Sequence, residues 1–381
     1  MDKYAEGLAR WMPRLVAVWR RARKLPEGPP TLTAKELKEV AAAIRTLSLG
    51  LTRDRQLAGA RYMDDPRLLG AYLLFYWPVS YAQGRQVLGE LPARSRTVLD
   101  LGSGPGPLGF AALDAGAGEV TCADRSRPAL ALARELAAEA GEALAIREWD
   151  PRRATELPVA RADAILMGHF LNELFGTGQP ALSGRAALVE RALAALRPGG
   201  SVVLIDPALR DTSRELLQLR DILVRRGFAV RAPCLFRGDC PALAKPSDWC
   251  HAERAWSMPP LLESLARTAG LHKEALKMSY LVLAPKGEVW PEPPAGRTFR
   301  IVSEALEGKG RQRFMGCGPE GRLGLALQEK HRTAANGPFF QLKRGDVVRL
   351  TETEPRGDGL ALSERSVVQV VAEAGRPTPS G

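Results

Sequence analysis

The sequence predicts an α/β protein in which a helical region precedes a Rossmann-like sheet and a small OB-like β-barrel follows it. Three observations support this fold class. A strand, a glycine-rich turn and a helix run from Thr97 to Ala115. Residues 95–230 alternate between short apolar runs and helical patterns, as the strands and crossover helices of a parallel sheet do. Residues 297–374 change to short β-like runs between glycines and charged residues, which is typical of a small barrel.

Composition bounds the class of protein. The chain has 381 residues, of which 45% are hydrophobic and 25% charged, so it can form two or three ordinary globular domains. No apolar run is long enough to span a membrane, and Met1–Lys24 carries acids at Asp2 and Glu6 and lacks the apolar core of a secretion signal. We therefore expect a cytoplasmic protein, or a matrix protein if the source has mitochondria. The net charge of +11 favours a nucleic acid as partner, although an arginine-rich genome would give the same excess.

The sequence predicts that residues 1–92 are helical. A basic amphipathic helix is expected within residues 1–30, and Thr33 is predicted to cap the next helix with Glu36 three residues on. A further helix is expected from residue 67 to about 88. Its aromatic run is predicted to belong to the core rather than to a surface that stacks on bases.

The glycine-rich turn Gly102-Ser103-Gly104-Pro105-Gly106 follows the strand that contains Asp100. Glycines let a backbone turn tightly and approach a ligand closely, and the following helix directs free N–H groups at that ligand. Asp100 is placed to order the turn. The next strand, residues 119–124, ends at Asp124, where an acid can bind ribose hydroxyls.

The segment D-L-G-S-G-P-G resembles the first motif of class I S-adenosylmethionine-dependent methyltransferases. NAD binding is the alternative, but Pro105 and Pro107 crowd the turn and fit the dinucleotide fingerprint less well. A third strand, residues 144–149, leads to an acid that can meet the adenine amino group. The residues expected to bind adenosylmethionine are Asp100, Gly102, Gly104, Gly106, Asp124, Asp150 and Met167.

The remaining elements complete the predicted sheet and divide the chain. Strands are expected at residues 162–168, 201–205, 228–231 and 279–284, and helices at 108–115, 128–140, 213–226 and 259–268. In the barrel, β-like runs are expected at 299–302, 339–342, 346–350 and 367–371. The expected domains are a helical region (1–92), a methyltransferase-like domain (93–290) with a cysteine-rich insertion (232–256), a basic β domain (297–374) and a disordered tail (375–381), with a linker at 291–294.

Five cysteines, an odd number, argue against a disulfide framework. Cys122 lies within a predicted strand and is expected in the core. Cys234, Cys240, Cys250 and Cys317 can bind zinc or hold an iron–sulfur cluster, and the spacing does not choose between these metals. His251 can replace one cysteine as a ligand, and four unrelated thiols are the remaining alternative.

With these cysteines in view, most of the chain resembles the small-ribosomal-subunit methyltransferase-like family, which includes the mitochondrial methyltransferase-like protein 17. The resemblance rests on Y-W-P-V-S, L-D-L-G-S-G-P-G, L-N-E-L and the P-C, C-P and W-C-H set that ends at Cys317. It implies a [4Fe-4S] cluster on Cys234, Cys240, Cys250 and Cys317, with zinc as the alternative. It also implies association with the small ribosomal subunit and its rRNA during ribosome biogenesis, by a protein that we expect to be monomeric off the ribosome.

Catalytic residues are harder to predict. The N/D-P-P-Y/F motif of amino-group methyltransferases is absent, because Gly168-His169-Phe170 stands in its place. His169, Asn172 and Glu173 can move a proton or orient a base, but they can equally cap a helix. Pro233-Cys234 resembles a cytosine C5 nucleophile but lies within the cysteine set. The interpretations are an rRNA methyltransferase, a ribosome-assembly factor without turnover, and a methyltransferase for another substrate.

Overall fold

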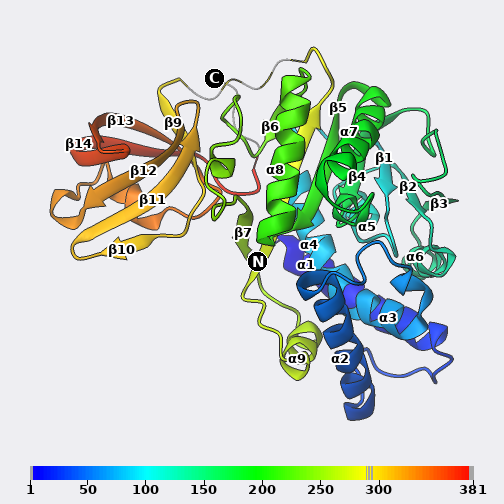
Figure 1. Cartoon of the computed structure of the whole chain (residues 1–381). Coiled ribbons are helices and arrows are strands. Elements are labelled where there is room, and N and C mark those ends of the chain that lie inside the picture. The colour runs from blue at the N-terminus through cyan, green and yellow to red at the C-terminus, as the bar shows by residue number, and fades with distance from the viewer. Residues whose placement is uncertain (1–2, 289, 291, 293–294, 377–381) are drawn as a thin grey trace.

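A computed structural model describes residues 3–288, 290, 292 and 295–376 (Figure 1). It contains a central sheet with helices on both faces, a helical layer beside it and a second sheet at one end. Residues 291 and 293–294 of the predicted linker and residues 377–381 of the predicted tail lie outside the described residues.

The first sheet has eight strands among the described residues, in the order β3-β2-β1-β4-β5-β8-β6, with β7 paired to β8 outside this path. β1 to β5 are parallel, whereas β8 runs antiparallel to β5, β6 and β7. The strands are β1 Thr97–Leu101, β2 Glu119–Asp124, β3 Ala145–Glu148, β4 Ala162–Gly168, β5 Leu196–Pro207, β6 Ala229–Ala232, β7 Ala252–Ala255 and β8 Ala275–Ala284. This arrangement confirms the predicted Rossmann-like sheet and brings the carboxyl ends of β1 to β5 to one edge.

Helices cover both faces of the first sheet because successive strand residues point to opposite sides. In β4, Ile165 and Met167 share a core with α7 and α8, whereas Ala164 and Leu166 share one with α4, α5 and α6. The helices are α4 Trp77–Leu88, α5 Pro107–Asp114, α6 Arg127–Ala140, α7 Gly178–Ala194 and α8 Arg210–Arg225. Burial on both faces explains why the strands read as continuous apolar runs.

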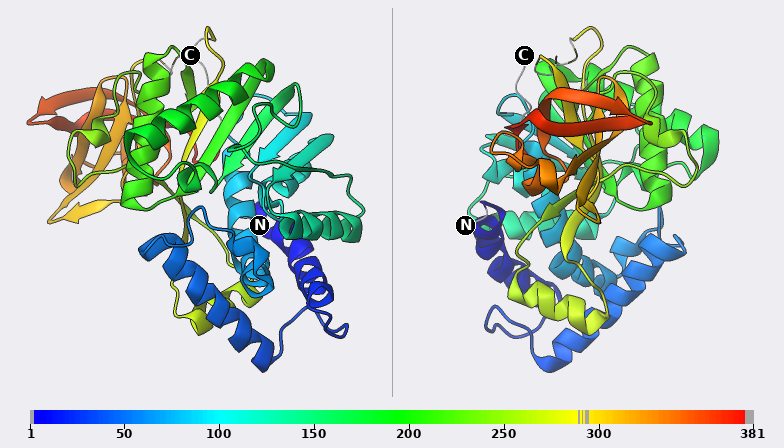
Figure 2. Two further views of the ribbon diagram at one scale, coloured as in Figure 1. Left: turned by 45° about the vertical axis from the view of Figure 1, so that its right-hand side comes forward. Right: turned by 90° about the vertical axis from the view of Figure 1, so that its left-hand side faces the viewer.

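A layer of helices lies below the first sheet in each view of Figures 1 and 2. It comprises α1 Lys3–Ala22, α2 Ala34–Ser48, α3 Pro66–Ala71 and α9 Pro260–Ala269, and a π-helical turn, Tyr72–Tyr76, joins α3 to α4. Thr33 and Glu36 form the predicted capping box. Leu262 and Leu265 of α9 share one buried core with the N-terminal helices. Among the described residues, no helix has the length and hydropathy that crossing a membrane requires.

The second sheet is mixed. Its six strands follow the order β10-β11-β12-β14-β13-β9, and β9 also pairs with β11. The strands are β9 Arg297–Ile301, β10 Leu306–Gly308, β11 Arg311–Gly318, β12 Gly321–Gln328, β13 Val347–Arg356 and β14 Gly359–Ala372. β12 and β14 are parallel, and the other pairs are antiparallel. Phe299, Phe314 and Phe339 lie in the core that these strands enclose.

The structure corrects several expected elements. Residues 339–342, expected as a strand, lie largely in a 3-10 helix at Gly337–Gln341 that buries Phe339. A short apolar run does not distinguish a strand from a buried helical turn, which explains the error. The strand expected at residues 201–205 is longer than predicted, because β5 starts at Leu196 and ends at Pro207. The strands β7, β10, β11 and β12 were not predicted, because β7 and β10 are very short and because arginine and glycine interrupt the apolar residues of β11 and β12.

Candidate functional site

The glycine turn between β1 and α5 requires backbone conformations that other residues rarely adopt. Gly102, Gly104 and Gly106 have φ angles of 66°, 53° and 83°, and Gly106 forms the N-cap of α5. The carboxylate of Asp100 accepts a hydrogen bond from the Gly109 N–H at 2.9 Å. Burial raises the pKa of Asp100 to about 8. Asp100 therefore orders the turn from behind, as predicted, and does not line the space in front of it.

Asp124, at the end of β2, binds the backbone of this turn and that of Ser126, which caps α6. Its two carboxylate oxygens accept hydrogen bonds from the Gly104 N–H at 2.8 Å and the Ser126 N–H at 2.7 Å. Burial raises the pKa of Asp124, while these two amides and Arg125 oppose that shift. The side chain therefore fixes the turn and also lines the space in front of it.

That space is a hollow of about 690 Å³, which we call the glycine-loop hollow. Gly102, Asp124 and Asp150, three of the residues expected to bind the cofactor, line it. Met167 is 1% exposed and packs in the core between the sheet and α7. Gly104 and Gly106 shape the turn rather than line the hollow.

Residues 55–65, between the N-terminal helices, form a roof over the glycine-loop hollow, and we call them the roof segment. Arg125 donates hydrogen bonds from Nη2 to the carbonyls of Gly59 at 2.9 Å and Ala60 at 2.6 Å. A Cβ atom on Gly104 would lie 3.0 Å from Cε of Met63, so the roof segment lies directly on the glycine turn. Sequence reasoning missed this contribution because a polar loop carries no periodic signal.

Glu173 joins the roof segment to the region after β4. Its Oε2 accepts a hydrogen bond from the Gly59 N–H at 3.2 Å. Burial raises the pKa of Glu173 to about 7. Phe170, three residues earlier, covers the turn from the other side, since a Cβ on Gly102 would lie 2.1 Å from its ring.

His169 lies at the end of β4, with a φ angle of 53°. Its Nε2 is 2.7 Å from Oε1 of Gln83, and Nε2 of Gln83 donates to the Lys277 carbonyl at 3.0 Å. Because the Gln83 oxygen can only accept, Nε2 of His169 carries a proton. Burial lowers the pKa of His169 to about 4, so the ring is neutral at physiological pH. Nδ1 is then an acceptor on a residue that lines the glycine-loop hollow.

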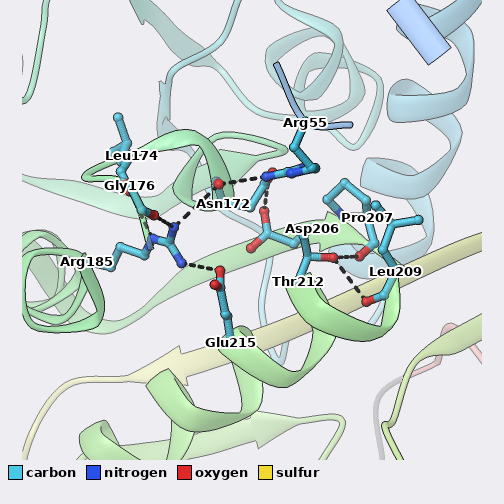
Figure 3. A network of polar contacts seen from close by, with 10 residues as sticks. All are labelled: Arg55, Asn172, Leu174, Gly176, Arg185, Asp206, Pro207, Leu209, Thr212 and Glu215. Carbon is cyan, nitrogen blue, oxygen red and sulfur yellow. Dashed lines mark hydrogen bonds and ion pairs between the residues drawn. The ribbon is translucent and has the colours of Figure 1, made fainter. Parts of the chain in front are cut away.

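Asn172 is held in the polar network that Figure 3 shows. Its side-chain amide donates to Oδ1 of Asp206 at 2.8 Å, and its side-chain oxygen accepts from Arg55 at 2.8 Å. Burial raises the pKa of Asp206 to about 7. Arg185 binds the carbonyl of Gly176 and the carboxylate of Glu215 at 2.8 and 2.6 Å. Asn172 thus uses both ends of its amide to connect the roof segment to β5, which is a positioning role.

The four cysteines of the predicted metal set line a second hollow of about 760 Å³, the cysteine hollow. Cys234, Cys240 and Cys250 follow β6, whereas Cys317 lies on β11 of the second sheet. The fifth cysteine, Cys122, is fully buried in β2, as predicted. Among the described residues, no group of three or more His, Cys, Asp or Glu side chains is arranged to hold a metal ion. The four thiols thus line one hollow without forming such a group among the described residues.

Burial dominates the electrostatics of these thiols. It raises the pKa of Cys240 to about 12 and that of Cys250 to about 11, and neighbouring thiols add to both shifts. Burial, followed by the other three cysteines, also raises the pKa of Cys317. Two buried donors on residues that line the hollow, Nε of Arg254 and Nε of Arg322, have no hydrogen-bond partner among the described residues.

The chain resembles known proteins both in a family profile and among solved structures. A family profile described as "Mitochondrial small ribosomal subunit Rsm22" matches residues 69–348. No curated protein matches the chain.

Among solved structures, the chain is similar to the ribosomal protein L11 methylase of Lactobacillus delbrueckii subsp. bulgaricus, with 17% identity over 54% of this chain and 77% of that one and a TM-score of 0.33. It is also similar to TrmN from Thermus thermophilus, with 21% identity over 55% and 52% and a TM-score of 0.36. A methyltransferase from Pyrococcus furiosus has 12% identity over 54% and 81%, with a TM-score of 0.35. Identities and scores this low say nothing about activity.

Proposed function

Because the chain belongs to the Rsm22 family of mitochondrial small ribosomal subunit proteins, we propose that it binds S-adenosylmethionine and acts on the small ribosomal subunit. The observation that carries the proposal is the glycine turn, which Asp100 and Asp124 order beside a partly open hollow. The family description names the ribosomal subunit, and the net charge of +11 suits a partner rich in phosphate. We propose that the protein is located in the same compartment as those ribosomes. We also propose that it is a monomer when it is not bound to them.

The residues of the glycine-loop hollow fit adenosylmethionine. The turn brings the backbone of Gly102 to the lining of the hollow, where glycine has no side chain of its own to obstruct a ligand. In this proposal the turn binds the methionine part, Asp124 the ribose hydroxyls and Asp150 the adenine amino group. When bound, the cofactor supplies a methyl group. The chain's own residues exclude water through the roof segment and Phe170.

Methyl transfer to rRNA and cofactor binding without turnover remain the two candidate functions. A specific observation favours the second. The roof segment and Phe170 lie directly on the glycine turn, and the acceptor-binding motif after β4 is replaced by Gly168-His169-Phe170. For turnover, His169 offers only a neutral ring that holds Gln83, and Asn172 is occupied by Asp206 and Arg55.

Two measurements test this part of the proposal. Titration calorimetry with adenosylmethionine should show binding that Asp124→Ala weakens and Asp163→Ala, at the opposite end of the sheet, leaves unchanged. Small-subunit particles from a deletion strain should then be incubated with the protein and labelled cofactor. Methyl incorporation identifies an enzyme, whereas binding without incorporation identifies an assembly factor. No binding of the cofactor would contradict both candidates.

We also propose that Cys234, Cys240, Cys250 and Cys317 hold a [4Fe-4S] cluster, with zinc as the alternative. The support for this proposal is the donor set, because four cysteines that are far apart in the sequence line one hollow, and four thiolates are the usual ligands of a [4Fe-4S] cluster. Donors on lining residues that have no partner in the described part of the chain, such as Nε of Arg322, suit the acceptor sulfurs of a cluster. The cluster would join the two sheets, because Cys317 alone comes from the second.

The absorption spectrum and the iron, sulfide and zinc content of anaerobically purified protein test this assignment. A broad band near ~400 nm, with about four irons and four sulfides per chain, supports the cluster. One zinc without sulfide supports the alternative and makes the site purely structural.

For the second sheet we propose an OB-like barrel. Five pairings support it: β9–β11, β11–β12, β12–β14, β14–β13 and β13–β9 form a path that returns to its start. We also propose domains at residues 1–92, 93–290 with its insertion at 232–256, and 297–374. A barrel that contacts RNA should bind with an affinity that falls steeply with salt, which filter binding to small-subunit rRNA at 50 and 200 mM salt would measure.

A further inference from the structure

The lining of the cysteine hollow has an unbalanced charge. Four arginines line it, and none of the described lining residues is an aspartate or a glutamate. The arginines are Arg254 on β7, Arg300 on β9, Arg322 on β12 and Arg344 just before β13. A buried positive charge is costly unless a negative group compensates it.

Carboxylates hold these arginines from behind rather than across the hollow. Glu90, whose side chain is 2% exposed, lies 3.6 Å from Arg254 and 3.3 Å from Arg300, so one carboxylate serves two guanidinium groups. Arg322 pairs with Asp248. Arg344 pairs with Glu304, which is largely exposed, and its Nη1 lies 2.8 Å from Nε2 of His251. The carboxylates that hold these arginines in place therefore do not belong to the lining of the hollow, whereas the guanidinium groups and the thiols do.

The first sheet supplies most of the cysteines of the hollow, and the second sheet supplies most of its arginines. Three of the four cysteines come from the first sheet and its connections, whereas three of the four arginines come from the second sheet and its connections. Arg322 pairs with Cys317 in the register of β11 and β12, so a thiol and a guanidinium occupy neighbouring positions. A negatively charged centre on the thiols of the first sheet would therefore attract the arginines of the second.

We propose that Arg254, Arg300, Arg322 and Arg344 form a charge-compensating shell, which makes the docking of the two sheets depend on an anionic thiolate-bound centre. This inference rests on the proposed four-cysteine site. Four thiolates exceed the charge of a zinc ion or of an oxidised [4Fe-4S] core by two, so either centre is an anion. The shell stabilises the loaded protein and destabilises the metal-free one. A purely structural arginine would stabilise both.

Arg322→Gln tests whether this arginine stabilises only the loaded protein, as the shell requires, or both forms, as a purely structural arginine would. Arg20 on α1 supplies the matched control, because its side chain is 9% exposed against 16% for Arg322, and each arginine pairs with one carboxylate, Glu36 or Asp248. Full-length wild type, Arg322→Gln and Arg20→Gln are purified anaerobically. Metal and sulfide content, the rate of metal loss to a chelator, and the thermal midpoint of loaded and stripped forms are measured for each. Arg344→Gln repeats the test if Arg322→Gln does not fold.

We expect Arg322→Gln to lose metal about tenfold faster than wild type. Its midpoint should fall in the loaded form and stay equal or rise in the stripped form. Arg20→Gln should lower the midpoint in both forms and leave the rate of metal loss unchanged. If wild type carries metal and Arg322→Gln behaves like Arg20→Gln, the shell is refuted and the metal site stands. Wild type without iron or zinc overturns the site itself, and the shell with it.

Discussion

Replacing Gly59 by alanine should release the roof segment from the glycine-loop hollow. Gly59 has a φ angle of 78°, and a Cβ atom there would lie 2.7 Å from the backbone carbonyl oxygen of Glu173. A backbone atom cannot move aside as a flexible side chain can, so the roof must shift. The shift breaks the hydrogen bond from the Gly59 N–H to the Glu173 carboxylate.

The magnitude follows from two contributions. An L-residue in the left-handed region costs about 1–2 kcal/mol. Loss of the hydrogen bond to the Glu173 carboxyl group, which is partly ionised near its pKa of about 7, costs a further ~1–3 kcal/mol. Gly116 provides the control, because its φ angle is 95° and a Cβ there would meet nothing within 4 Å. Gly116→Ala thus carries the backbone cost alone, and about 2 kcal/mol should separate the two variants.

Amide hydrogen exchange of peptides from the roof segment measures this difference. About 2 kcal/mol corresponds to roughly 30-fold faster exchange in Gly59→Ala than in Gly116→Ala, because local opening sets the exchange rate of such a segment. Peptides from β4 should exchange at equal rates in both variants. Equal exchange of the roof segment in the two variants would show that the contact with Glu173 does not hold the roof closed.

The remaining predictions concern protonation and the cysteine hollow. Because burial raises the pKa of Glu173 from its ordinary range to about 7, the folded state binds this proton more tightly than the unfolded state, and the free energy of unfolding should fall as the pH rises from 5 to 8. Glu173→Gln should lessen that fall; denaturant unfolding at pH 5 and 8 measures the difference, and an unchanged slope would refute it. Cys317→Ser should lower the metal content and expose the second sheet to proteolysis. Cys122→Ala, which removes a thiol outside the hollow, should keep both properties, and a Cys317→Ser variant with full metal content would count against a four-thiol site.

Local chemistry made much of the fold predictable. Buried parallel strands are apolar along their length, so β1, β2 and β4 stand out in the sequence, and the glycine turn after β1 identifies the ligand edge. Thr33 and Glu36 predict the start of α2, because a capping box needs only four residues. Signals of this kind are confined to one element.

Features that depend on distant contacts were not predictable in the same way. The roof segment reaches Glu173 across more than a hundred residues, and only the fold brings Gly59 to that carboxylate. Met167 was expected at the ligand, but alternation along β4 turns it into the core. The arginines around the cysteines come from four separate segments of the chain. The sequence contains many other arginines, so nothing in it distinguishes these four.

The helical layer has a consequence for the order in which the chain can fold during synthesis. Leu262 and Leu265 of α9 complete the core that Trp11 and Trp19 of α1 share, so this layer lacks part of its interior until about residue 270 has left the ribosome. Domains generally fold from the N-terminus as they emerge, but these first helices must wait with apolar faces uncovered. Contacts between such distant segments also slow folding, because a long loop must close first. The nascent N-terminus is therefore the part of this chain that most needs a chaperone.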